Sequence, residues 1–279
     1  MGKLHELYSR LFNLVVEDDM ESQSYYLQLV SKRRNISVEY LQSIGMIFIP
    51  NNNYIYHYLG EEAKSYNCGL YYNDTCPWTN FFLIPIMDLS GEIQGLVGWD
   101  VYNKFREETL GEQGLAAYKC SPSTVFKRDK YFLCDVDCLK EKFDCRTIFV
   151  TDGVFDAVSL NYRGVPAIAL LGSSFSPEII YFLSWYKNIY VCADNDAAGN
   201  RLYSRLKKSL SGVHKVVQNK YKDIEELLRN DGLSGPVTKQ LQSVVDCKSA
   251  GQDIYLTTGR PVFKIPTGLT EMNLQNSDK

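Results

Sequence analysis

The sequence predicts an α/β protein in which a parallel sheet flanked by helices follows a smaller, mixed α+β subdomain. From about residue 146 onward, short apolar runs alternate with helical periodicity, which is typical of a parallel sheet covered by helices. Before that point, helical spacing is followed by two apolar runs around a polar turn, which indicates a hairpin. With 279 residues, 45% of them apolar, the chain can bury the core of one large or two small domains.

Helical and hairpin patterns occupy the first part of the chain. Leucines and a valine at helical spacing predict a helix over residues 4–16, and a second helix-like stretch covers 25–30. Two apolar runs, over 81–87 and 93–97, flank a polar turn that contains glycine. This order of strand, turn and strand predicts a β-hairpin.

Three tyrosines alternate with other residues between these two regions. Tyr54, Tyr56 and Tyr58 follow a chain break of three asparagines, and their alternation indicates one face of a strand. The rings could stack single-stranded bases. A half-buried strand that packs its rings is the more common arrangement, and we favour it.

The second half of the chain shows a regular alternation of elements. Strands are expected over 147–150, 167–171, 188–193 and 213–217, and helices over 154–162, from the proline of Ser176-Pro177 onward, and over 198–210. We expect residues 1–145 to form an amino-terminal subdomain and residues 146–232 to form the α/β domain. Residues 233–279 are expected to be a carboxy-terminal tail or small helical extension with little core.

The charge of the chain argues against a uniformly basic nucleic-acid binder. The formal net charge is −3, whereas neutralising phosphates requires clustered lysine and arginine. Three local clusters therefore matter more: residues 32–34, residues 127–130, and residues 201–222, which hold seven basic residues and no acidic one. Each cluster could equally be a solvated face of the protein.

Cysteine spacing and hydropathy exclude several classes of protein. The eight cysteines are scattered, so we expect reduced thiols and no zinc. Cys134, Cys138 and Cys145 could in principle gather around zinc with a histidine, but their spacing is loose. No stretch approaches the roughly 18 apolar residues of a membrane span, and the acidic amino terminus is unlike a signal peptide. We expect a cytoplasmic protein, in the host cytoplasm if a phage encodes it.

Acidic residues follow three of the expected strands, where each strand ends. They are Asp152 and Asp156 after the first strand, Asp194 and Asp196 after the third, and Asp223, Glu225 and Glu226 after the fourth. Ligands of open parallel sheets collect at this edge. Crowded carboxylates raise one another's pKa, so a cation such as Mg²⁺, which prefers oxygen ligands, is their natural partner. Asp194 and Asp196 could instead merely cap the next helix, but three acidic groups after three strands favour a metal site.

These segments resemble the Toprim domain, which bacterial-type primases, type IA and type II topoisomerases and several nucleases share. Residues 148–156 look like its strand-Glu-Gly-x-x-Asp motif, residues 194–199 like the primase form Asp-x-Asp-x-Ala-Gly, and residues 222–227 like its Lys-Asp-Pro-Asp-Glu segment. Residues 82–95 look like the hairpin of the primase amino-terminal polymerase subdomain, which favours a primase over a topoisomerase. The resemblance is to DnaG-like primases of bacteria and bacteriophages, and it covers residues 25–230.

The resemblance implies a Toprim catalytic domain behind a template-binding subdomain, and an enzyme that makes RNA primers on single-stranded DNA from nucleoside triphosphates. Two Mg²⁺ or Mn²⁺ ions would assist nucleotidyl transfer. The implied catalytic residues are Asp152, Asp194 and Asp196, and the implied metal ligands are these three with Asp156, Asp223 and Glu225. The expected nucleic-acid-binding residues are Lys32, Arg33, Arg34, Lys119, Lys127, Arg128 and Lys130. A replicative helicase is the expected partner, because the sequence has no Gly-x-x-x-x-Gly-Lys-Ser/Thr loop.

Three features depart from the family pattern. Asp152 stands at the position of the motif glutamate, Trp99 stands where many primases have an arginine, and the usual amino-terminal zinc-binding module is not seen. We therefore expect template choice to come from elsewhere. Two alternatives stay open: a Toprim-type metal-dependent nuclease that uses water as the nucleophile, and a catalytically weakened nucleic-acid-binding replication factor.

Overall fold

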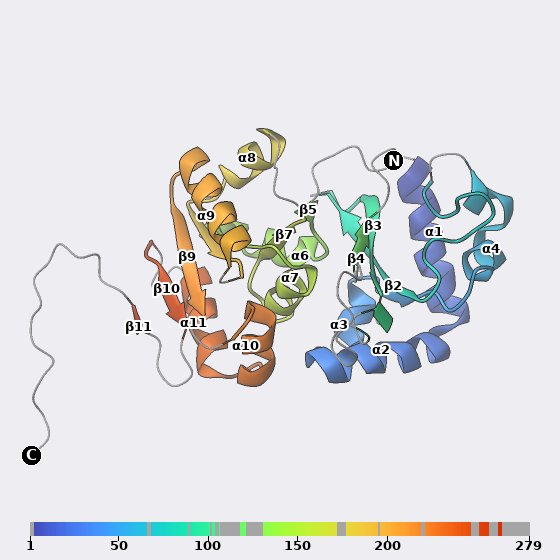
Figure 1. The fold of residues 1–279 in the computed structure, drawn as a ribbon, viewed down its shortest axis with the longest axis horizontal. Coiled ribbons are helices and arrows are strands. Elements are labelled where there is room, and N and C mark those ends of the chain that lie inside the picture. Colours follow the sequence, from blue (N-terminus) through green and yellow to red (C-terminus); the bar gives the residue numbers. More distant parts are fainter. Residues whose placement is uncertain are drawn as a thin grey trace, which may run out of the picture.

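The computed structural model describes residues 3–65, 68–88, 90–100, 102–103, 106, 118–120, 131–171, 177–194, 196–218, 221–246, 251–256 and 262–263. Within these residues the strands form two sheets, one of four strands in the order β1-β2-β3-β4 and one of seven in the order β11-β10-β9-β8-β6-β7-β5. The two sheets and their helices lie one after the other along the long axis of the molecule (Figure 1). An α+β part thus precedes an α/β part, as the sequence predicts.

The first part of the chain surrounds an antiparallel sheet. Its elements are α1 (Lys3–Asp18), α2 (Met20–Arg34), α3 (Val38–Ser43), β1 (Ile47–Phe48), α4 (Tyr54–Leu59), the 3-10 helix η1 (Gly60–Lys64), β2 (Phe81–Met87), β3 (Ile93–Asp100) and β4 (Tyr118–Cys120). β2 and β3 pair along their whole length, with Phe82 opposite Trp99, and this confirms the predicted hairpin. The helix predicted over 4–16 is confirmed as α1, which buries Leu7, Leu11 and Val15 at helical spacing.

The expectation of a strand over the three alternating tyrosines is wrong, because residues 54–59 form helix α4. The side chains that this segment buries most deeply are Ile55 and Leu59, which lie four residues apart and therefore on one face of a helix. Tyr54 is half-buried and its hydroxyl donates to the Asp19 carboxylate at 2.5 Å, so this ring is fixed by protein contacts.

The second part of the chain is built on the larger sheet. Its elements are β5 (Tyr131–Phe132), α6 (Val136–Glu141), η2 (Phe143–Cys145), β6 (Thr147–Thr151), α7 (Val154–Asn161), β7 (Ala167–Leu170), α8 (Pro177–Leu183), β8 (Asn188–Cys192), α9 (Ala197–Ser209), β9 (Val213–Gln218), α10 (Ile224–Asp231), α11 (Pro236–Val245), β10 (Ile254–Leu256) and β11 (Val262–Phe263). The five central strands are parallel, and β5 and β11 are antiparallel at the edges. This sheet confirms the strand and helix alternation that the sequence predicts.

The order of the strands creates a switch point beside β6. The chain passes from β6 to β7 on one side and then returns to β8 on the other side, because β6 lies between these two strands. In open α/β sheets the crevice that binds ligands lies outside the carboxyl ends of the strands at such a point. The fold therefore marks the ends of β6 and β8 as the place to look for a site.

The expectation that the last forty or so residues contribute little core is wrong for α11 and β10. β10 extends the parallel sheet by pairing with β9. Leu241 and Val244 of α11 and Ile254 of β10 are fully buried and belong to the same hydrophobic core as the central strands. The apolar positions of α11 recur at helical spacing, which is the signal that could have identified this helix.

Two exclusions made from the sequence can be compared with the described residues. Cys134 and Cys138 are buried free thiols, and burial is the main cause that raises the pKa of Cys138 to about 12. The side chain of Cys145 lies outside the described residues. Within the described ranges, none of the helices combines the length and the apolar character that crossing a bilayer requires.

The packing of α11 gives a prediction for stability. Replacing the fully buried Leu241 by alanine should lower the free energy of unfolding by about 2–5 kcal/mol, because it removes a core side chain and leaves a cavity. Replacing Leu233, which is 52% exposed and lies just before the same helix, should change it by less than about 0.5 kcal/mol. Urea unfolding of both variants measures the difference, and equal effects would show that α11 is not part of the core.

Candidate functional site

Two carboxylates lie at the switch point, each directly after a strand. Asp152 follows β6 and Asp194 follows β8, and these two strands pair in parallel with Thr151 opposite Cys192. The backbone N–H of Asp194 lies 3.3 Å from the Asp152 carboxylate oxygen Oδ2, to which it donates. The two predicted catalytic residues are thus neighbours because their strands are neighbours.

Burial and neighbouring charges act together on the carboxylates of Asp152 and Asp194. Burial is the largest cause that raises the pKa of Asp152, and the charges of Asp196 and Asp223 add to it. Burial and then the charges of Asp152 and Asp223 raise the pKa of Asp194 to about 6, while Lys222 opposes this shift. Burial, with nearby carboxylates adding to it, therefore favours protonation of both groups in the absence of a cation.

Asp196 and Asp223 both begin helices at this edge of the sheet. Asp196 is exposed, and its Oδ1 accepts a hydrogen bond of 2.8 Å from the backbone N–H of Gly199 in the first turn of α9. Asp223 accepts in the same way from Glu226 N–H at 2.8 Å in the first turn of α10. Capping engages one carboxylate oxygen of each residue, so both residues act as caps in this structure.

Asp156 joins helix α7 to the start of α10. Its buried carboxylate accepts a hydrogen bond of 3.0 Å from the backbone N–H of Glu225. Burial, followed by the charge of Asp223, raises the pKa of Asp156 well above its ordinary value. A Cβ at Gly153 would lie 2.0 Å from Asp156 Oδ2, so a larger residue there would force this carboxylate to move. Asp156 thereby holds α10, and Asp223 with it, against the end of β6.

The side chain of Glu225 is held from the other half of the molecule. Arg34, the last residue of α2, is buried and pairs with the Glu225 carboxylate at 2.7 Å. Its guanidinium lies over the rings of Trp99 and Phe155, at 5.1 and 4.4 Å from their centroids. Glu225 also lies 3.8 Å from Arg229 of its own helix. We name the residues Arg34, Glu225, Trp99 and Phe155 the inter-subdomain clamp.

Backbone contacts reinforce the clamp at the end of α2. Arg229 Nη1 donates to the carbonyl oxygen of Arg33 at 3.2 Å, and the side-chain amide of Asn35 donates to the carbonyl of Arg229 at the same distance. The sequence did not indicate this role for Arg34, because its partner lies 191 residues further along the chain. Trp99, which the sequence analysis noted as a departure from the family pattern, is one of the two rings beneath the Arg34 guanidinium.

The predicted nucleic-acid-binding residues are not equivalent in the structure. Arg34 is turned inward by the clamp, so its guanidinium is not presented to DNA as the sequence suggested. Lys32 is exposed on α2 and Arg33 is half-buried. Lys119 is exposed on β4, donates to the carbonyl of Pro77 at 3.2 Å and lies over Trp78. The remaining three predicted residues, Lys127, Arg128 and Lys130, lie outside the described residues.

The donor set at the switch point fits a divalent cation completed by substrate. Among the described side chains, no three acidic, histidine or cysteine groups form a ready-made metal cage. Mg²⁺ is usually held by one or two carboxylates together with waters and substrate phosphates, so a closed cage is not required. Burial and neighbouring carboxylates raise the pKa of Asp152 and Asp194, and Lys222 offsets this only in part at Asp194. The buried Glu225 carboxylate already has a counter-ion in Arg34.

The fold and this site define a class of protein, and comparison with known proteins specifies it. Residues 149–228 match the family described as Toprim-like, so the chain contains a Toprim-like domain. A DNA primase domain from Pseudomonas aeruginosa superposes with a TM-score of 0.67 over 86% of this chain and 78% of that one, at 21% identity. A DnaG primase catalytic domain bound to single-stranded DNA gives 0.65 over 88% and 78%, at 20% identity. The chain therefore has the fold of the DnaG-like primase catalytic core.

A curated relative extends this likeness to the sequence. A protein described as DNA primase from Thermotoga maritima is 28% identical over 282 residues. That alignment includes 94% of this chain and 46% of the relative, so the chain spans about half the length of the protein it matches. The resemblance to DnaG-like primases inferred from the motifs is confirmed.

The clamp gives a prediction for stability. Replacing Arg34 by methionine should lower the free energy of unfolding by about 3–5 kcal/mol, because it leaves the buried Glu225 carboxylate without its closest counter-charge. Replacing both Arg34 and Glu225 by methionine should cost clearly less than the sum of the two single changes. Urea unfolding of the two single variants and the double variant gives the coupling energy.

A matched control for the clamp lies on the protein surface. Arg10 and Glu62 form an ion pair with the same 2.7 Å separation, but their side chains are 42% and 64% exposed. Arg10→Met should cost no more than about 1 kcal/mol, because exposed ion pairs contribute little. If Arg34→Met costs no more than Arg10→Met, the clamp does not hold the two halves together.

The crowded carboxylates predict a pH-dependent stability. The raised pKa of Asp194 means that the folded protein binds an extra proton between the ordinary pKa near 3.8 and about 6. Stability should therefore fall as pH rises through this window. Asparagine does not ionise, so Asp194→Asn should not lose stability in this window. At pH 7.5 in EDTA it should be about 1 kcal/mol more stable than wild type. This value is reduced for solvent screening, because Asp194 is half-exposed. The difference should vanish near pH 4.

Added magnesium should make the wild type more stable than Asp194→Asn at pH 7.5. It should raise the melting temperature of the wild type more at pH 7.5 than at pH 5, because ionised carboxylates bind the cation, and it should raise that of Asp194→Asn less. Asp246→Asn removes an exposed carboxylate at the end of α11 and should behave as wild type. An equal magnesium response in Asp194→Asn and wild type would remove Asp194 from the metal site.

Proposed function

We propose that this chain is a DNA primase that synthesises short RNA primers on a single-stranded DNA template. The observation that carries the proposal is the convergence of Asp152, Asp194, Asp196 and Asp223 at the switch point of a Toprim-like sheet, within a fold that matches DnaG primase catalytic cores. The single-stranded DNA bound to one of those cores supports the assignment of the template. Production of primers for DNA replication, in a phage or a bacterium, would be the biological role.

The four carboxylates of the site would have different roles, according to their contacts. Asp152 and Asp194 are the proposed principal metal ligands, since they are adjacent and lie among other carboxylates that raise the pKa of both. Asp196 and Asp223 would each present the carboxylate oxygen that is not used for capping. Bound Mg²⁺ or Mn²⁺ ions, two in the proposed arrangement, would lower the pKa of an attacking 3′-hydroxyl and neutralise a departing pyrophosphate.

The two buried acids have supporting roles in this proposal. Asp156 would fix α10 through its hydrogen bond to the Glu225 backbone. The sequence predicted Glu225 as a metal ligand. In this proposal its side chain would anchor the clamp instead, because Arg34 already neutralises it. Both residues would then hold other parts of the site in place without binding the metal.

The amino-terminal half would hold the template. Exposed Lys32 and Lys119 are the described residues best placed to contact phosphates, with Lys127, Arg128 and Lys130 proposed from the sequence alone. Nucleoside triphosphates would enter at the carboxylates, and a replicative helicase is the partner that the resemblance implies. We expect primer synthesis by the isolated chain to be weak and to rise when the helicase from the same source is added.

The product of the reaction tests the proposal. Incubation with a labelled single-stranded template, labelled ribonucleotides and magnesium should give short RNA and leave the template intact. A shortened template would instead identify a nuclease that uses water as the nucleophile. If no RNA and no shortened template form, and if magnesium does not change the stability of the protein, the chain is a nucleic-acid-binding factor without catalysis.

Single substitutions at the carboxylates test the assignment within this assay. Asp196→Asn keeps a good N-cap residue but removes the charge, so folding should survive while RNA synthesis falls by more than about 10–100-fold. Asp152→Glu restores the family residue, and we expect activity to fall, because Asp152 already contacts the Asp194 backbone and catalytic groups tolerate only about 0.5 Å of displacement. Wild-type activity in Asp196→Asn would contradict the metal-site assignment.

A further inference from the structure

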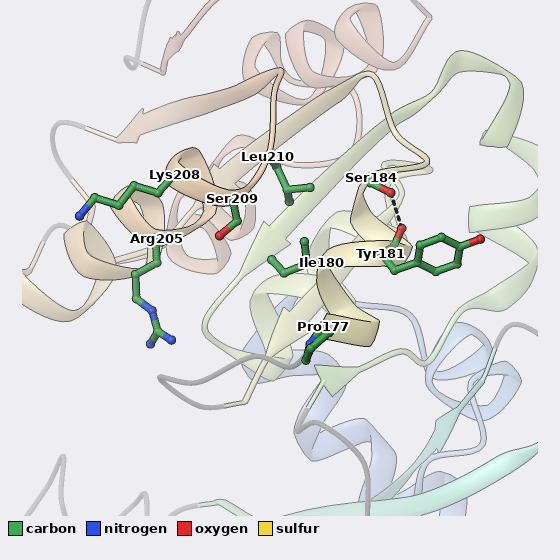
Figure 2. Close-up of a pocket in the computed structure, with 8 residues that line it drawn as sticks. All are labelled: Pro177, Ile180, Tyr181, Ser184, Arg205, Lys208, Ser209 and Leu210. Carbon is green, nitrogen blue, oxygen red and sulfur yellow. Dashed lines mark hydrogen bonds between the residues drawn. The ribbon is translucent and has the colours of Figure 1, made fainter.

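A groove on the outer face of the Toprim-like domain belongs to none of the residues assigned above. It lies between α8 and α9 and has a volume of about 730 Å³, within the roughly 300–1,000 Å³ typical of ligand sites. Its lining residues are Pro177, Ile180, Tyr181, Ser184, Arg205, Lys208, Ser209 and Leu210. Figure 2 shows an apolar floor of Pro177, Ile180 and Leu210, with Arg205 and Lys208 at the α9 rim and Tyr181 at the α8 rim, its ring pointing away from α9.

Exposed aromatic rings gather around α8. Tyr181 is 66% exposed and Trp185 is 40% exposed, and their rings meet edge to face with centroids 5.5 Å apart. Phe143, a third exposed ring, contacts Tyr186 on the neighbouring side of this helix. Exposed rings of this kind provide stacking surfaces for unpaired bases.

Helix α9 supplies positive charge along the opposite wall. It contains Arg201, Arg205, Lys207 and Lys208 and no acidic residue. Arg201, Arg205 and Lys208 recur at a spacing of four and three residues, which places them on one face of the helix. The only acidic residue of α8, Glu178, is not among the residues that line the groove. The charge of the groove is therefore complementary to a phosphate backbone.

The basic face of α9 connects the groove to the carboxylate site. The helix begins at Asp196, its N-cap, and Lys208 lies twelve residues further on. At 1.5 Å per residue the helix spans about 18 Å between these two positions. A strand that follows the basic face of α9 must span this distance to reach the carboxylates.

We propose that the groove between α8 and α9 binds single-stranded DNA, with a base stacked on Tyr181 and phosphates on Arg205 and Lys208. The apolar floor and the basic rim together are complementary to bases and phosphates, which favours an unpaired nucleic-acid strand as the occupant. The identity of the strand rests on the proposed function: the template is the strand that is present before any bond forms. The Lys208 end of the groove would then hold template about 18 Å along α9 from the carboxylates.

Fluorescence anisotropy of the full chain with a labelled thymidine 20-mer tests the proposal in EDTA and without nucleotides. Tyr181→Ala should weaken binding at least about fivefold, the loss expected for one stacked base. Arg205→Gln with Lys208→Gln should reduce the slope of log affinity against log salt by about 1.4, since each phosphate contact with a single strand contributes about 0.7. Unchanged affinity and slope in these variants would overturn the proposal.

Two matched variants separate the groove from general charge and shape. Lys207→Gln removes the same charge from the same helix, but Lys207 donates to Tyr203 at 2.9 Å and does not line the groove, so its salt slope should fall by less than half as much. Tyr181→Phe keeps the stacking ring and should bind as wild type. Lys208→Gln should also be measured as a single variant. If its salt slope falls by the same amount as that of Lys207→Gln, only the overall charge of the helix matters.

The choice of competitor identifies the occupant. Unlabelled single-stranded DNA should displace the probe, and RNA of the same sequence should compete less well with wild type. If RNA competes better, or if Tyr181→Ala weakens only the binding of the replicative helicase, the assignment to single-stranded DNA is wrong. Because the assay contains no metal and no nucleotide, absence of primer synthesis would leave its result standing and would contradict only the proposed function.

Discussion

The buried ion pair between Arg34 and Glu225 is the interaction on which the arrangement of the site depends. It connects the end of α2 to the start of α10, and the Glu225 backbone in turn donates to Asp156 on α7. A side chain at Gly153 would displace the Asp156 carboxylate that accepts this hydrogen bond. Separating a buried pair costs far more than separating an exposed one, so the position of α10 is tied to the amino-terminal half. A structural contact between two subdomains thereby fixes the edge of the site.

The carboxylates beside the Arg34–Glu225 pair lower the stability of the folded protein. Burial raises the pKa of Asp152, Asp156 and Asp194 at the ends of β6 and β8, and repulsion between the carboxylates adds to this shift. A sequence optimised for stability alone would not place these charges together. The arrangement is typical of a site that exchanges stability for the ability to bind a cation and an anionic substrate.

The sequence predicts local elements well and long-range contacts poorly. The hairpin and the alternation after residue 146 were recognised because their periodicity is local. The tyrosine segment was misassigned because its polar rings alternate like a strand, while Ile55 and Leu59 carry the helical spacing. The inward turn of Arg34 follows from a partner far away in the sequence, and no local pattern contains it. The carboxylates could be predicted because parallel strands bring their ends together.

The central claim is that the carboxylates at the switch point bind divalent metal for nucleotidyl transfer. An anomalous difference map from crystals of this protein soaked with Mn²⁺ and a nucleoside triphosphate tests it most directly. The account predicts a peak within about 2.0–2.3 Å of oxygens of Asp152 and Asp194, the range of Mg²⁺-like coordination. A map with bound triphosphate and no metal peak at these carboxylates, or with a peak only elsewhere, would contradict the claim.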